Sequence, residues 1–198
     1  MIAPPKGNNA LRRCLEQNAP KAHQYIEKTT KMCNTYATNG GIMSSTVSIE
    51  STKSKITALK KVHDKKAKLN KHRSGLLNRV PNDGDYELFV KGHVTIEDLA
   101  YLTAATGCEF ALLKGKKNDV LFHGGKYNCS FDKVLSDSLK SNKYRLYAHS
   151  HPDEDNPVPS VADRNTLETI GQDHSLIISA TTLRITRYSN NQCLDYLL

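Results

Sequence analysis

The sequence predicts a mixed α/β (α+β) domain, a sheet flanked by helices, preceded by a helical N-terminal region. Three observations support this fold class. From residue 81 onward, short apolar segments of strand length alternate with segments of helix length. Turn residues such as glycine and proline separate these segments. The length of 198 residues suffices for one full domain with an appendage. We therefore expect a basic, helical region over residues 1–80 and the main domain over residues 81–198.

The N-terminal region has few apolar residues, in keeping with a hydrophobic fraction of only 38% for the chain. Residues 1–9 are rich in proline, glycine and asparagine, which predicts a disordered lead-in, and residues 10–36 fit two short helices or one broken helix. The Ser- and Thr-rich residues 44–52 predict a link. Across residues 51–77, apolar side chains recur every three or four residues, which predicts one long helix with a narrow apolar stripe.

The net charge of +8 is concentrated in this expected helix. The segment from Lys53 to Arg79 holds ten basic residues and one acidic residue, Asp64. A basic segment can attract nucleic acid, but this one has no aromatic side chain to stack on a base and no nucleic-acid-binding motif. We expect its lysines to form a solvated face of the helix. The apolar stripe of the same helix is expected to dock against the main domain, a partner or a larger assembly. Nucleic-acid contact is the less favoured alternative.

The main domain is predicted to alternate strands and helices. Thr95 can cap a helix that runs to Thr103, with Glu97 and Asp98 in its first turn, where the helix dipole favours negative charge. Gly107 is expected to end this helix. The strands are expected at residues 86–90, 109–113, 120–123, 144–148, 176–179 and 183–188, and further helices at residues 130–139 and 160–170, with hairpins joining the second strand to the third and the fifth to the sixth.

The cysteines and the hydropathy of the chain limit the cellular compartments in which we expect the protein. The chain has no run of 18 or more apolar residues and no apolar segment at its start, so we expect neither a membrane span nor a cleaved signal peptide. Five cysteines without a C-x-x-C pair predict reduced thiols and no disulfide framework. We expect a cytoplasmic protein, or one exported by a route without a cleaved signal peptide.

The residues that carry chemistry follow the strand expected at residues 144–148. His149 and His151 are two positions apart, and because side chains on a strand alternate between its faces, both rings are expected to point the same way. Asp163 lies twelve residues after His151, near the start of a predicted helix. Two imidazoles and a carboxylate form a ligand set that Zn²⁺ can use while its fourth tetrahedral position stays open to water. Ordinary strand histidines, with an aspartate that only favours its helix N-terminus, are the alternative.

The same segment carries the longer pattern H-S-H-P-x7-S-x2-D, from His149 to Asp163. This pattern resembles the metal-binding motif of the JAMM (MPN+) metalloprotease family, and the resemblance covers about residues 95–190. It implies the MPN, or cytidine-deaminase-like, fold, with any closing element after Tyr188 reduced or missing. It also implies Zn²⁺ as cofactor, with His149, His151 and Asp163 as its ligands and Ser160 as a donor to the developing oxyanion.

The family also needs a general base, a glutamate at the start of a strand upstream of the motif. Glu109 opens the strand expected at residues 109–113 and precedes His149 by forty residues. The resemblance therefore implies that Glu109 takes a proton from the zinc-activated water and returns it to the leaving amine. A surface role for Glu109 and a purely capping role for Ser160 are the alternatives.

By resemblance, the function is hydrolysis of a peptide or isopeptide bond in a protein substrate, such as a ubiquitin-like protein or its conjugate. The segments at residues 97–111 and 171–179 are similar to JAB-type modules of bacterial polymorphic-toxin and phage-like proteins, which implies a toxin- or effector-associated processing domain. Two rival hypotheses come from other classes of protein: a non-catalytic MPN-type interaction module, and a nucleic-acid-associated protein that binds through its basic segment.

Three further residues could bind metal or act as nucleophiles but match nothing in the motif. His123 and His174 are expected to be structural or exposed. Cys129 is not expected to act as a nucleophile, because the zinc site would occupy the histidines and the aspartate that could activate it.

Overall fold

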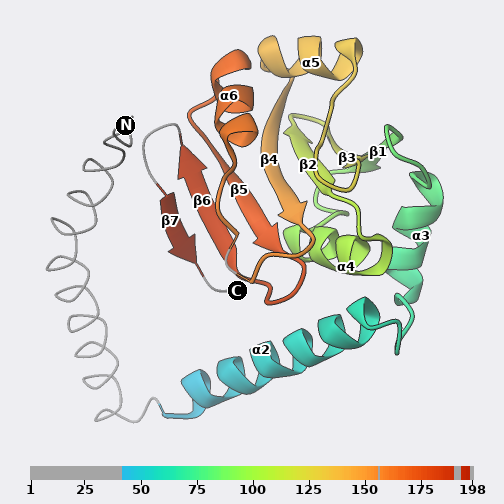
Figure 1. Cartoon of the computed structure of the whole chain (residues 1–198), viewed down its shortest axis with the longest axis vertical. Coiled ribbons are helices and arrows are strands. Elements are labelled where there is room, and N and C mark those ends of the chain that lie inside the picture. The colour runs from blue at the N-terminus through green and yellow to red at the C-terminus, as the bar shows by residue number, and fades with distance from the viewer. Residues whose placement is uncertain (1–41, 156, 190–192, 197–198) are drawn as a thin grey trace, which may run out of the picture. The chain divides into compact units, whose positions relative to one another are not determined.

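The computed structural model describes residues 42–155, 157–189 and 193–196 (Figure 1). The chain divides into two compact units, Met1–Ser51 and Thr52–Leu198. The expectations for residues 1–9 and 10–36 lie outside the described residues. The second unit contains the sheet and all of the candidate site residues.

Seven strands of the described chain form one mixed sheet in the order β1-β3-β2-β4-β5-β6-β7. Neighbouring strands are antiparallel except β4 and β5, which are parallel. A parallel pair needs a crossover connection, and helix α6 supplies it. The predicted mixed α/β class is therefore confirmed. The strands are β1 (Tyr86–Val90), β2 (Phe110–Gly115), β3 (Asn118–His123), β4 (Tyr144–His151), β5 (His174–Ser179), β6 (Ile185–Ser189) and β7 (Cys193–Tyr196).

Helices cover both faces of this sheet, and the alternation along β2 separates two apolar cores. Phe110 and Leu112 pack with side chains of α2, α3 and α4, whereas Ala111 and Leu113 pack with side chains of α5 and α6. The helices are α2 (Ile42–His63), α3 (Lys71–Arg79), α4 (Ile96–Thr106), α5 (Lys133–Lys140) and α6 (Val161–Thr169). Both hairpins expected from the sequence, β2–β3 and β5–β6, are present.

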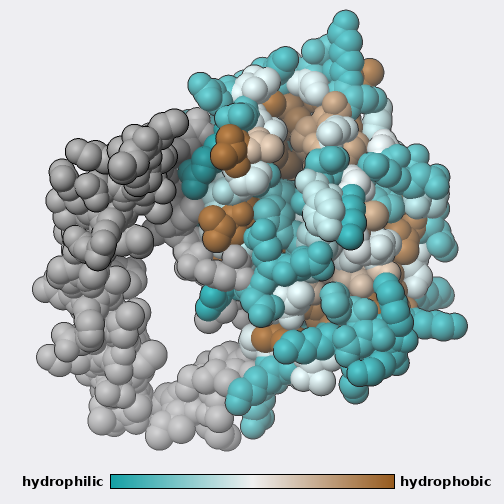
Figure 2. Space-filling model, in the orientation of Figure 1, coloured by the Kyte–Doolittle hydropathy of each residue, from teal (hydrophilic) through white to brown (hydrophobic). Residues whose placement is uncertain are grey.

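The described part of the face seen in Figure 2 is largely polar. Hydrophilic side chains cover most of the described part of the face seen in Figure 2, and hydrophobic side chains form small separate groups there. Scattered apolar side chains of this kind are normal on a protein surface. No helix of the described residues is both long enough and apolar enough to span a membrane.

The single long helix predicted at residues 51–77 is wrong, because the chain forms α2 and α3 with a turn between them. Lys65 adopts a positive φ of 60°, which is incompatible with a continuous α-helix. Asn70 then caps α3 by accepting a hydrogen bond from the backbone N–H of Arg73 at 2.8 Å. Helix α2 also starts at Ile42, so the Ser- and Thr-rich residues 44–52, expected to form a link, are helical.

Residues between positions 52 and 80 share a core with the sheet. Leu59 and Val62 of α2, Leu76 of α3 and Val80 are all buried in the core that contains α4. Residues 52–80 therefore lie in the same compact unit as the strands, and the division of the chain falls between Ser51 and Thr52. The expected division at residue 80 would have cut through this core.

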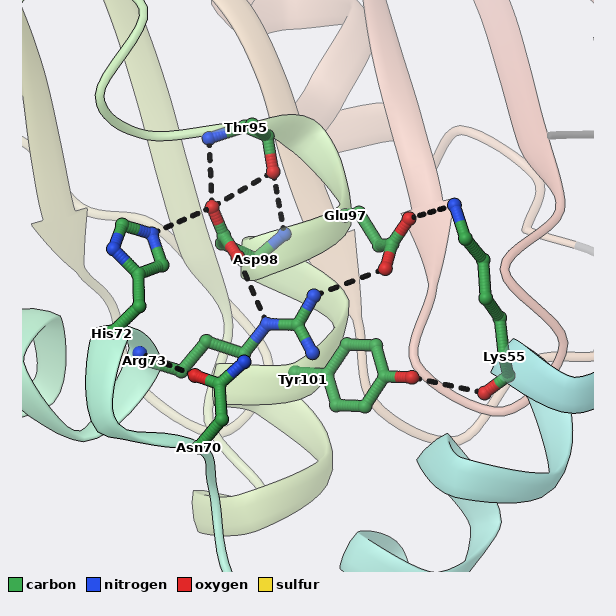
Figure 3. Close-up of polar contacts among 8 residues, drawn as sticks. All are labelled: Lys55, Asn70, His72, Arg73, Thr95, Glu97, Asp98 and Tyr101. Atoms are coloured by element: carbon green, nitrogen blue, oxygen red, sulfur yellow. Dashed lines mark hydrogen bonds and ion pairs between the residues drawn. The ribbon is translucent and has the colours of Figure 1, made fainter.

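Arg73 connects α3 to the first turn of α4 (Figure 3). Its Nε donates to Asp98 Oδ1 at 2.9 Å, its Nη2 donates to Glu97 Oε1 at 3.0 Å, and its guanidinium lies 3.5 Å from the centre of the Tyr101 ring. Thr95 caps α4 as the sequence predicted, and Asp98 accepts from its backbone N–H in return. Burial alone would raise the pKa of Asp98, but hydrogen bonds from Arg73 and Thr95 outweigh it and hold that pKa below its usual value.

Replacing Asp98 by alanine is expected to lower the free energy of unfolding by about 3–5 kcal/mol. The change removes one half of the capping box, since the Thr95 N–H loses its acceptor, and leaves the largely buried Arg73 without one of its two carboxylate partners. Urea unfolding followed by circular dichroism measures the loss. Glu87→Ala is the matched control: it breaks an exposed 2.7 Å pair with Arg79 and should cost under about 1 kcal/mol. Equal losses in the two variants would contradict this account of the α3–α4 contact.

The C-terminal strand β7 was not expected from the sequence. It pairs antiparallel with β6 and forms that edge of the sheet. A strand of four residues has too short a pattern to be recognised without its partner, because its register is determined by β6.

Candidate metal centre

Strand β4 places His149 and His151 on one face of the sheet. Both side chains are buried, and their Nε2 atoms lie 3.1 Å apart. The strand is longer than expected and includes both histidines, so the alternation that predicted a common direction for the two rings holds up to its last residue.

Ser150, between the two histidines, points to the opposite face of the sheet. Its hydroxyl is fully buried, accepts a hydrogen bond from the backbone N–H of Phe110 at 2.9 Å and lies 2.6 Å from Thr103 Oγ1. These contacts join β4 to the start of β2 and to α4. Because Phe110 directly follows Glu109, the Ser150 hydroxyl fixes the start of β2 relative to the histidines.

Asp163 approaches the histidines from the first turn of α6. Its Oδ1 lies 3.0 Å from His149 Nε2 and its Oδ2 lies 3.7 Å from His151 Nε2. Ser160 and Asp163 form a capping box: the Ser160 hydroxyl accepts from the Asp163 backbone N–H, and Asp163 Oδ2 accepts from the Ser160 N–H at 2.7 Å. Burial would raise the pKa of Asp163, but hydrogen bonds and charge from His149 and the bonds from Ser160 hold it far below its usual value.

Glu109 directly precedes β2 and lies against a loop that holds its backbone at both ends. Its N–H donates to Gly125 O and its carbonyl accepts from Gly124 N–H, each at 2.8 Å. A Cβ atom on Gly124 would come within 2.5 Å of Asn128 O, so only glycine permits this close approach. Burial is the main reason that the pKa of Glu109 rises to about 7, with the His151 charge acting in the opposite direction.

His151 has a further partner that the sequence did not indicate. Glu154 Oε2 lies 3.0 Å from its Nδ1 and also accepts from Val158 N–H at 3.1 Å. A carboxylate on Nδ1 keeps the proton there, orients the ring and leaves Nε2 free to bind a metal ion. An acidic residue three positions after a candidate ligand was the available signal, but it has no defined place in the motif.

All the predicted site residues line one cavity of about 330 Å³ on the α5–α6 face of the sheet. Leu146, Tyr188 and Phe131 supply apolar walls, and no lysine or arginine lines the cavity in the described residues. The lining comprises Glu109, Tyr127, Asn128, Cys129, Ser130, Phe131, Leu146, His149, His151, Pro152, Asp153, Glu154, Ser160, Ala162, Asp163, Thr166 and Tyr188.

His149, His151 and Asp163 could together hold a metal ion, because one ligand atom from each lies within 4.8 Å of the other two. The donors are two imidazole nitrogens and a carboxylate oxygen, a set that catalytic metal sites in proteins use. Their surroundings fit such an ion, since the carboxylate is held in its ionised form and Glu154 orients one ring.

The other candidate residues lie near the site without joining the ligand set. Cys129 lines the cavity, with Sγ 3.7 Å from Glu109 Oε2, and burial raises the pKa of its thiol well above the usual value. A thiol in that state is a poor nucleophile. His123 is buried against Phe110 with its Nδ1 2.8 Å from Val80 O, and His174 lies at the start of β5, outside the cavity lining.

Comparisons with models of protein families, with curated proteins and with solved structures find no match to this chain.

Replacing Glu154 by alanine is expected to weaken the binding of a divalent metal ion by about 10- to 100-fold, because the ring of His151 loses its orienting partner. Competition against a chromogenic chelator measures the affinity. Asp153→Ala is the matched control, since Asp153 lines the same cavity without a hydrogen bond to either histidine. Unchanged affinity in Glu154→Ala, or an equal loss in both variants, would exclude this role.

Glu109→Gln is expected to stabilise the metal-free protein, and more strongly at high pH. The folded-state pKa of about 7 lies above the usual 4.5, so the folded protein keeps a proton that the unfolded chain releases. The stability from this proton is lost as the pH rises through about 7, whereas glutamine does not titrate. The difference in free energy of unfolding between the variant and the wild type should be on the order of 2 kcal/mol larger at about pH 8.5 than at about pH 5.

Urea unfolding in the presence of a chelator, at both pH values, measures this difference. Glu168→Gln provides an exposed control on α6 that should show no such pH dependence. A Glu109→Gln difference that is constant with pH would contradict the raised pKa.

Proposed function

We propose that this protein is a zinc-dependent metallopeptidase of the JAMM (MPN+) type, which hydrolyses a peptide or isopeptide bond in a protein substrate. The observation that carries the proposal is the meeting, in one cavity, of a His-His-Asp ligand set with a buried carboxylate whose pKa is near 7. A metal ligand set and a separate group able to exchange protons at neutral pH are the two parts that metal-assisted hydrolysis needs.

Zinc is the ion that this donor set fits best. His149 and His151 offer borderline nitrogen donors, Asp163 offers a hard oxygen donor, and this combination is common at catalytic zinc sites. Bound zinc would supply a water of lowered pKa and would polarise the scissile carbonyl.

Glu109 is the general base in this proposal. Its carboxylate oxygen accepts a proton from the attacking water, and the resulting acid returns it to the leaving nitrogen. A pKa of about 7 suits both steps, because at neutral pH the group exists in both protonation states. The Ser150 hydroxyl and the loop at Gly124 and Gly125 hold this residue in place.

Ser160 is the oxyanion donor. Its oxygen accepts from the Asp163 N–H at 3.1 Å, which holds the hydroxyl beside the Asp163 carboxylate. In this proposal the hydroxyl donates its hydrogen to a substrate oxygen as negative charge develops there. One such donor contributes about 10²–10³ to the rate.

The substrate in this proposal is a protein, such as a ubiquitin-like protein or its conjugate, and the processing of a toxin or effector is a related role. The motif resemblance supports this class. The cavity supports it too, because the exposed Tyr127 lines it and the exposed Val161 lies between its lining residues Ser160 and Ala162, so both offer apolar contacts to a polypeptide.

The experiment that tests the proposal is elemental analysis of the purified protein beside His149→Ala/His151→Ala. About one zinc per chain is expected in the wild type, and none in the double variant, because two of three ligands are lost. Glu109→Gln should keep the zinc and lose at least about 10²-fold in cleavage of a linear or lysine-linked conjugate.

Three outcomes would contradict the proposal in different ways. Absence of zinc from the wild type, even after zinc is added back, would exclude the metallopeptidase. Retained zinc, with hydrolysis unaffected by Glu109→Gln, would exclude the assigned base. Retained zinc without any hydrolysis by the wild type would favour a non-catalytic interaction module.

A further inference from the structure

We propose that a second cavity, formed by α2, α3, the turn between them and Tyr101 of α4, binds a small phosphomonoester with an apolar group. This cavity has a volume of about 480 Å³ and shares no residue with the metal centre. Its lining comprises Ser54, Thr57, Ala58, Lys61, Val62, Ala67, Lys68, Leu69, Asn70, Arg73 and Tyr101.

The lining carries positive charge without a matching negative charge. No aspartate or glutamate lines the cavity among the described residues, whereas Lys61 and Lys68 do. Neither lysine has an ion pair or side-chain hydrogen bond within the described part of the chain, although Lys55, Lys65 and Lys66 nearby all do. The two ammonium groups are therefore available to a ligand.

Arg73 adds a donor whose direction the protein has already fixed. Its side chain is only 15% exposed, and its Nε and Nη2 are bound by Asp98 and Glu97. Figure 3 shows the remaining guanidinium nitrogen on the side of the Tyr101 ring, away from both carboxylates. Because Arg73 lines the cavity and is held in place, this donor costs little ordering when a ligand binds.

The charge balance indicates a dianion. Arg73 and Lys55 offset Glu97 and Asp98 within the network of Figure 3. Lys61 and Lys68 then remain as an excess of two positive charges at the cavity. A phosphate monoester carries about −1.5 to −2 at neutral pH and matches this excess, whereas a carboxylate carries only one negative charge.

The remaining walls determine the rest of the ligand. Ala58, Val62, Ala67 and Leu69 form an apolar side, next to the Tyr101 ring. A volume of about 480 Å³ falls in the range of small-molecule sites, so the group attached to the phosphate is a compact apolar one. A cavity with two lysines at an apolar wall favours a small molecule. A nucleic acid would instead follow an extended basic face.

Titration of the full chain with phenyl phosphate, followed by isothermal calorimetry, tests the proposal. Saturable binding is expected, with phenol and benzoate each at least about tenfold weaker, since they lack the dianion. The variant Lys61→Gln/Lys68→Gln should bind phenyl phosphate about 10- to 100-fold more weakly. Lys53→Gln/Lys60→Gln is the matched control: it removes the same charge from exposed positions of α2 outside the cavity and should change the affinity by less than about twofold.

Every other outcome would overturn the proposal. Equal losses in the two double variants would indicate diffuse attraction to the basic segment, and affinity unchanged in both would place the ligand elsewhere, such as at the metal centre. Benzoate binding as tightly as phenyl phosphate would exclude the dianion. Absence of saturable binding, or tighter binding to a short oligonucleotide or to anionic vesicles, would exclude a small-molecule site.

Discussion

The alternation of side chains along the end of β4 is the constraint on which the rest of the structure depends. Three consecutive polar residues are buried there, and each must find partners on its own face. His149 and His151 face α6 and meet Asp163, while Ser150 faces α4 and bonds to Thr103 and Phe110. A shift of one residue in the pairing of this strand would exchange the two faces and leave all three without partners.

The capping box of α6 provides hydrogen-bond partners both for the helix N-terminus and for the Asp163 carboxylate. A helix N-terminus has N–H groups without partners, and a buried carboxylate needs donors. Asp163 and Ser160 satisfy each other, so the carboxylate is ionised and oriented before any ligand arrives. Because its second oxygen faces His149, the group that begins the helix also completes the site.

Local patterns in the sequence were enough to predict the mixed sheet and the strand and helix that carry the candidate ligands His149, His151 and Asp163. Alternation predicted the common direction of His149 and His151, and capping signals predicted the start of α4. The break near Lys65 was missed because apolar spacing continues across it, and both α2 and α3 pack on the same core. Glu154 was missed because its contact with His151 depends on how a loop folds back, which no periodicity encodes.

Assembly of the candidate metal centre depends on the crossover between the parallel strands β4 and β5. The hairpins β2–β3 and β5–β6 join neighbours through short turns, whereas β4 and β5 can pair only after the intervening chain has crossed the sheet. His149 and His151 precede this crossover and Asp163 lies on it, so the three ligands meet only when the crossover has closed. An ion bound there would select the finished topology over chains in which only the hairpins have formed.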